Sequence, residues 1–161
     1  MANNNTVTNL TGQMRSMKLV YWAMALVQVV FGVAVYAIIS MKMMGAANYD
    51  LALTLQKILM IFAPAAMAVG YFLFRYMLSK LDKKLPLTEK IKRYFSLVLV
   101  RAALFEAAFL FCGVAALVTQ VLLFLWIAPV IFFVFVLLRP TPEGLAADLD
   151  LTPADRNKLI Q

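Results

Sequence analysis

Four long apolar runs dominate this sequence, at residues 19–39, 55–77, 94–117 and 121–138. A helix of about 20 apolar residues crosses the ~30 Å hydrocarbon core of a bilayer, so each run has the length of a membrane span. Open strands leave backbone groups unpaired in lipid, and the alternating pattern of a membrane barrel is missing from the sequence. The sequence therefore predicts an all-α protein, an integral membrane four-helix bundle.

The composition agrees with this class and argues against several others. The chain is 64% hydrophobic and only 14% charged, whereas about 25% of the residues of soluble domains are charged. It has one cysteine, Cys112, and no histidine, so we expect neither an internal disulfide nor a metal site. No nucleophile has a base close to it in the sequence, and no glycine loop suits a phosphate. We therefore expect no enzyme activity and no cofactor.

Positive charges set the expected orientation in the membrane. The connection between the second and third runs is strongly basic, and its basic residues are Lys80, Lys83, Lys84, Lys90, Lys92 and Arg93. Lysine and arginine are enriched in cytoplasmic loops, so we expect this connection and both termini in the cytoplasm, with a bacterial inner or plasma membrane as the location. The basic loop lacks the aromatic and glycine pattern of nucleic-acid modules, so no nucleic-acid partner is expected.

The chain divides into three parts. They are a polar cytoplasmic leader (1–17) without regular structure, a membrane domain (18–139) and a cytoplasmic tail (140–161) with short helices. In the tail, Thr141 and Thr152 each precede a proline and an acid, which is a helix start signal. We expect two short tail helices that lie near the headgroups or the basic loop, with Asp148 and Asp150 close to Lys83 and Lys84.

The first and third runs share a local pattern, and so do the second and fourth. The matched segments are 25–31 with 103–109, and 62–65 with 127–130. The match favours two tandem helical hairpins, although alanine, leucine and phenylalanine are common enough here for chance similarity. It pairs Gln28 with Glu106 and Pro64 with Pro129. Because a proline inside a helix frees the carbonyl four residues earlier, these residues predict a polar cluster in the middle of the membrane.

Glu106 is the main candidate site residue, because it lies near the middle of the third run. Insertion scales assign an acidic side chain at that depth a cost of roughly 3 kcal/mol. Two interpretations stay open. Glu106 binds a proton or a cation on a transport path, or it is neutral and hydrogen-bonds Gln28, which fixes how the helices pack.

Arg101 is the second charge inside the third run, about two turns from Arg93. Its long side chain is expected to reach back to the inner headgroups. A contact with Tyr71, at a similar depth in the second run, or with an acidic group of another subunit is the alternative. Arg101 and Tyr71 therefore complete the set of candidate residues.

Two functions are consistent with these features. The first is a small structural or accessory subunit of a membrane assembly, since no catalytic group and no complete ion path is recognisable. The alternative is a small proton- or cation-coupled carrier or channel built around Glu106. The expected partners are the lipid bilayer and either another membrane protein or further copies of the chain.

Overall fold

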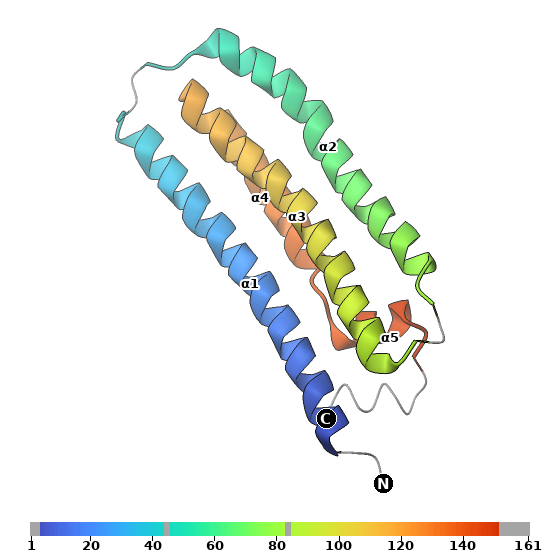
Figure 1. Cartoon of the computed structure of the whole chain (residues 1–161). Helices are drawn as coiled ribbons and strands as arrows, with labels where there is room; N and C mark the ends of the chain where they lie inside the picture. Colours follow the sequence, from blue (N-terminus) through green and yellow to red (C-terminus); the bar gives the residue numbers. More distant parts are fainter. Residues whose placement is uncertain (1–3, 44–45, 83–84, 152–161) are drawn as a thin grey trace.

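The structure is a computed structural model that describes the backbone of residues 4–43, 46–82 and 85–151, and the side chains from residue 12 onward within these ranges. All regular structure in these ranges is helical, as the sequence predicts (Figure 1). The helices are α1 (Asn4–Ser40), α2 (Tyr49–Ser79), α3 (Leu87–Thr119), α4 (Leu123–Leu137) and α5 (Pro142–Asp148). We refer to the end of the bundle where α5 packs as the α5 end, and to the opposite end as the far end.

Helix α3 is the centre of the molecule. It packs against α1, α2 and α4, and α1 also touches α4, whereas α1 and α2 lie on opposite sides of α3 (Figure 1). Small residues allow close packing: a Cβ added at Gly70 of α2 would lie 3.3 Å from the Phe105 ring of α3. The expected pair of tandem hairpins is therefore wrong for its first half. The connection from Ser40 to Tyr49 is long enough to carry α2 across to the far side of α3.

Helices α3 and α4, the expected second hairpin, pack side by side and are joined by a short turn. Gln120 directly follows α3 with a φ of 55°, in the left-handed region that ends a helix sharply. At the same end, the backbone N–H of Asn48 donates to the carbonyl oxygen of Thr119 at 2.9 Å. The Asn48 side chain in turn accepts from the N–H of Leu51 and caps α2.

Three helices are long and apolar enough to cross a bilayer, namely α1 from Gly12, α2 and α3. Helix α4 has 15 residues, about 22 Å at 1.5 Å per residue, which is less than the ~30 Å hydrocarbon core. It passes the same test only together with α5, from which it is bent by 71°. The helix is thus shorter than the expected span at 121–138, because the first two residues of that span lie in the turn that follows α3. Pro140 prevents α4 from continuing past its other end.

The polar leader differs from its expected lack of regular structure. Helix α1 begins at Asn4 and continues without a break into the first apolar run. Met14 and Met17 are buried against the α5-end half of the bundle. Packing of these two methionines extends the helix well beyond the apolar run, and the polar composition of the leader gives no sign of it.

The first tail helix is confirmed as α5, capped by Thr141, whose hydroxyl oxygen accepts from the N–H of Gly144 at 3.0 Å. Leu145 of α5 is fully buried in the α5-end cluster of apolar residues, together with residues of α1 and α3. The second expected tail helix lies outside the described residues, as do Lys83 and Lys84.

Candidate functional site

The most unusual polar side chain in the bundle is Gln28 of α1. It has no exposed surface, and neither its amide nitrogen nor its amide oxygen has a hydrogen-bond partner. Leaving a buried polar group unpaired costs about 1–3 kcal/mol, so buried amides are nearly always paired. Gln28 is therefore the first residue at which the structure suggests a function beyond packing.

Gln28 lies at one end of a groove between α1 and α4. The groove has a volume of about 530 Å³. Its other lining residues are Val29, Gly32, Val33 and Tyr36 of α1, Phe109 of α3, and Leu122, Leu125, Trp126, Ala128, Pro129 and Phe132 of the α4 segment. Apart from Gln28, the lining is almost entirely apolar.

Near the α5 end, α1 and α4 are in direct contact. There the rings of Tyr21 and Phe135 stack with centroids 4.4 Å apart, and the Tyr21 hydroxyl donates to the Phe135 carbonyl oxygen. Phe132, one turn before Phe135 in α4 and further from the α5 end, lines the groove. Phe109 of α3 forms its floor. The rings of Phe109 and Phe132 lie 6.4 Å apart at this deep end.

Pro129 lines the same groove as Gln28, together with Leu125, the residue whose carbonyl loses its helical donor to the proline. The structure thus brings together two of the candidate residues that the sequence alignment placed at similar depth. Pro64 does not join them, because it lies on the exposed side of α2, and α2 packs against α3 rather than beside the groove.

Glu106 is separate from this groove. It lies on α3 between Phe105, which faces Gly70 of α2, and Phe109, which faces Gly32 of α1. Its side chain is half-buried and forms no hydrogen bond or ion pair with the chain as far as the structure describes it. Because both amide atoms of Gln28 are unpaired, the expected Glu106–Gln28 hydrogen bond is not formed.

Arg101 extends toward the α5 end of the bundle, where it contacts the last residues of α4. It is only 8% exposed, and its guanidinium donates to the carbonyl oxygen of Leu138 at 2.6 Å. The same group lies 4.3 Å from the centre of the Phe74 ring. The last carbonyls of a helix lack intrahelical donors and carry partial negative charge, so Arg101 caps the end of α4.

Tyr71, the alternative partner of Arg101, is exposed on α2 and packs edge-on against Phe72 with ring centroids 5.7 Å apart. Arg101 instead uses a residue that the sequence does not single out, Phe74, one turn further along α2. The capping role depends on where α4 ends, and for that reason the apolar pattern of α4 gave no signal for it.

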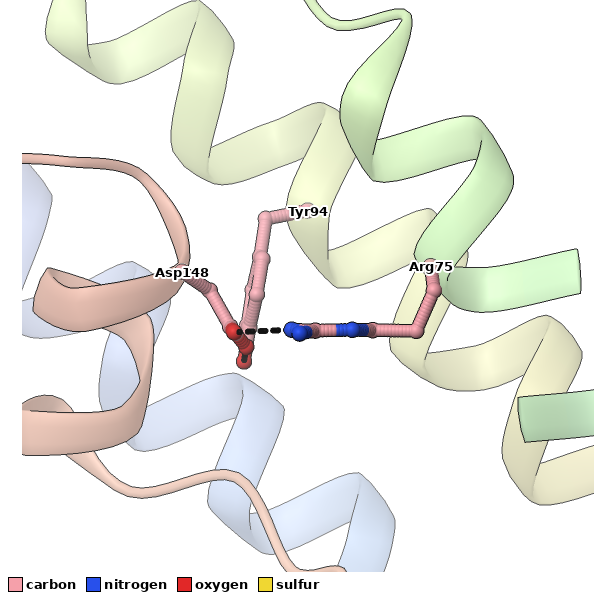
Figure 2. Close-up of polar contacts among 3 residues, drawn as sticks. All are labelled: Arg75, Tyr94 and Asp148. Carbon is pink, nitrogen blue, oxygen red and sulfur yellow. Dashed lines mark hydrogen bonds and ion pairs between the residues drawn. The ribbon is translucent and has the colours of Figure 1, made fainter. Parts of the chain in front are cut away.

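A polar contact at the α5 end also escaped sequence reasoning. Asp148 of α5 forms an ion pair with Arg75 of α2 at 3.4 Å and accepts a hydrogen bond from the Tyr94 hydroxyl of α3 at 3.1 Å (Figure 2). Asp148 was expected near basic residues, although near Lys83 and Lys84 rather than Arg75. These contacts join three helices at one point and hold α5 against the bundle.

The fold and these sites define an all-helical protein with three helices, or up to four, long and apolar enough to cross a membrane, which indicates a membrane protein. Among the described residues, no group of three or more histidine, cysteine or acidic side chains is placed to hold a metal ion. Comparisons with family models, with curated proteins and with solved structures found no match to this chain.

Proposed function

We propose that this protein is an accessory or structural subunit that associates with another membrane protein inside the bilayer. The α5 end would face the cytoplasm of a bacterial inner or plasma membrane. Basic residues gather at that end, on α2 and at the start of α3, in agreement with the enrichment of lysine and arginine in cytoplasmic loops.

The observation that carries the proposal is the open side of α2. Among the helices, α2 packs closely only against α3, and its opposite side is exposed. Met60 and Pro64 lie on that exposed side, one turn apart, and Met60 is 64% exposed. Pro64 removes the helical donor of the Met60 carbonyl. In lipid, an unpaired carbonyl is costly, and a neighbouring helix commonly supplies the missing donor.

A partner helix along this side of α2 could donate a hydrogen bond to the Met60 carbonyl, whereas lipid tails have no donor. Apolar exposure by itself would not be a reason, because lipid tails are as apolar as leucine and membrane helices associate through packing and hydrogen bonds. The support comes from the combination of a freed carbonyl, a helix with one close neighbour and alanines at exposed positions 65 and 68 that permit close approach.

The proposal can be tested with a photoreactive benzophenone side chain placed at Ile61 of α2, which is 75% exposed and lies on the same side as Pro64. Val30 of α1, 59% exposed, is the matched control. After illumination of native membranes, we expect a discrete protein adduct from Ile61 and only lipid adducts from Val30. Lipid adducts at both positions would contradict the proposal.

A carrier or channel built around Glu106 is the second candidate. One observation favours it, namely a carboxyl group inside a span without a partner in the described part of the chain. Against it, Gln28, Glu106 and Arg101 do not line one path, and Arg101 is occupied by α4. A proton or cation flux in proteoliposomes that disappears with Glu106→Gln would favour the carrier over the accessory subunit.

A further inference from the structure

We infer that the groove between α1 and α4 binds a lipid-soluble small molecule with a carbonyl or hydroxyl group on a flat ring, held at its polar end by Gln28. This site is distinct from the open side of α2 and does not depend on the proposed function.

The Gln28 amide offers two N–H donors and one carbonyl acceptor, and none of them is used within the described chain. A trapped water would need two to four polar partners to be held. Gln28 is the only side-chain amide in the lining, and the other polar side chains there are Tyr36 and Trp126. A water at the deep end would have Gln28 and at most the freed carbonyl of Leu125 as partners, the fewest that can hold it. A ligand instead brings its own polar group with an apolar body that suits the rest of the lining.

The groove has the size and the lining of a small-molecule site. Its volume of about 530 Å³ falls within the ~300–1,000 Å³ of such sites, which are mostly apolar with few polar groups. From Gln28 to Tyr36 it follows eight residues of α1, about 12 Å. Trp126 at the side of the groove is 79% exposed, so a ligand has lateral access from the bilayer.

The deep end of the groove favours a ring. Phe109 and Phe132 line the same groove as Gln28, and flat rings pack well against aromatic faces. Because Gln28 has no exposed surface, the side chains that cover its amide must move for a ligand to reach it. The ligand's apolar chain then lies along Val33 and Pro129.

Other occupants fit this arrangement less well. A second copy of the chain would bring its own Gln28, but that amide is equally buried, so the two amides do not meet. A partner helix is about 10 Å wide, too wide to reach the deep end without a long polar side chain. The acyl chain of a membrane lipid would place a methyl group against Gln28 and leave the amide unpaired.

The experiment uses the purified full chain in lipid nanodiscs with decylubiquinone as the probe. Trp126 reports binding, because a quinone quenches a nearby indole, and Trp22→Phe removes the only other tryptophan. We expect saturable quenching by decylubiquinone that an excess of decylbenzene, which has the ring and chain but no oxygen and is itself no quencher, does not reverse. Quenching that does not saturate, or that decylbenzene reverses at equal concentration, would overturn the inference.

Two variants separate the amide from the groove. Gln28→Met is expected to weaken decylubiquinone binding about tenfold, as the loss of hydrogen bonds to a buried amide predicts. Val33→Phe leaves Gln28 in place, fills the groove sterically, and is expected to abolish saturation. Binding that survives Val33→Phe, or that is unchanged in Gln28→Met, would overturn the assignment. Neither result bears on the crosslinking at Ile61, so the two proposals fail independently.

Discussion

The α5-end half of the bundle and the region beside the groove differ in how their polar side chains are paired. At the α5 end, Arg101 caps α4, Tyr21 donates to the backbone of α4, and Asp148 binds both Arg75 and Tyr94. Beside the groove, Gln28 has no partner, although it is more deeply buried than any of these.

At the α5 end, only the Oε1 atom of Gln13 is buried without a partner among the described side chains, whereas beside the groove both amide atoms of Gln28 lack one. The paired residues lie where α4 ends and α5 begins, so free carbonyls and an acidic side chain are available to them. Gln28 faces α4 in its helical interior, where backbone groups are mostly used within the helix. The paired half is a structural region, and the unpaired one is a candidate binding site.

The largest expected effect comes from breaking the paired half at Arg101. Arg101→Leu leaves the Leu138 carbonyl without its donor and removes the cation–π contact with Phe74. A charged hydrogen bond contributes about 1.5–3 kcal/mol and a buried cation–π pair about 1–2 kcal/mol, so we expect a loss of about 3 kcal/mol in the free energy of unfolding. Unfolding by SDS in mixed micelles measures this.

Arg101→Lys is the control for charge alone. Lysine keeps the charge and a donor but not the flat guanidinium that lies over Phe74, so a smaller loss, about 1–2 kcal/mol, is expected. If Arg101→Leu is as stable as the wild type, the cap on α4 contributes nothing and the comparison between the two halves fails.

The second effect concerns how closely α1 packs against α3. A Cβ added at Gly113 of α3 would collide with the Phe31 ring of α1, whereas one added at Gly32 would lie 3.5 Å from the Phe109 ring, an ordinary contact. Gly113→Ala is therefore expected to destabilise the protein by about 1–2 kcal/mol through overpacking. Gly32→Ala is the matched control and is expected to be neutral or slightly stabilising.

Thermal unfolding of the two glycine variants in the same detergent provides the measurement. Equal destabilisation would mean that α1 packs tightly against α3 along its whole length. The volume of the groove would then depend on the position of α4 and not on that of α1. A difference in the expected direction would show that α1 is held by α3 near Gly113 but has free space beside Gly32.

A smaller effect is expected for the contact that holds α5. Asp148→Ala removes the ion pair with Arg75 and the hydrogen bond from Tyr94 (Figure 2). Since Arg75 is exposed, the ion pair contributes little, and most of the expected loss of about 1 kcal/mol comes from the hydrogen bond. Tyr94→Phe should therefore account for most of it, and Arg75→Gln for little.

Amide hydrogen exchange of α5 tests this order. Protection of the Leu145 and Leu149 amides should fall most in Asp148→Ala, less in Tyr94→Phe and least in Arg75→Gln. Unchanged protection in all three variants would show that burial of Leu145, and not the polar contact, holds α5 in place.

Sequence reasoning gave the class of fold and part of the site. Apolar length predicts the helices, and two of the candidate residues, Gln28 and Pro129, line one groove. Sequence reasoning failed for contacts that depend on which helices pack against each other. The Glu106–Gln28 hydrogen bond and the α1–α2 hairpin both assumed a packing order that hydropathy does not contain, because all sides of these helices are similarly apolar.

The ends of helices were the second source of error. The position where α4 stops determines that Arg101 is a cap, and the burial of Met14 and Met17 determines that the leader is helical. Both depend on tertiary contacts. The signal of Thr141 before Pro142, in contrast, is local chemistry, and it predicted the start of α5 correctly.

The smallest expected effect on stability, and the one most informative about the groove, belongs to Gln28→Met. Methionine has nearly the same length but no polar atoms, so it removes an unpaired amide without opening a cavity. We expect the free energy of unfolding to be unchanged or to rise by up to about 1 kcal/mol, in contrast to the loss at Arg101. SDS unfolding of both variants under one set of conditions gives the comparison.

A loss of more than about 1.5 kcal/mol in Gln28→Met would mean that the amide has a partner in the isolated protein, and the two halves would then be alike in their pairing. An unchanged or raised free energy of unfolding would mean that the Gln28 amide does not stabilise the isolated protein. Buried polar groups that destabilise the free protein are typical of binding sites, where the ligand supplies the missing partner. In that case decylubiquinone should stabilise the wild type against SDS but leave Gln28→Met almost unaffected, since only a ligand that binds the folded state raises its stability.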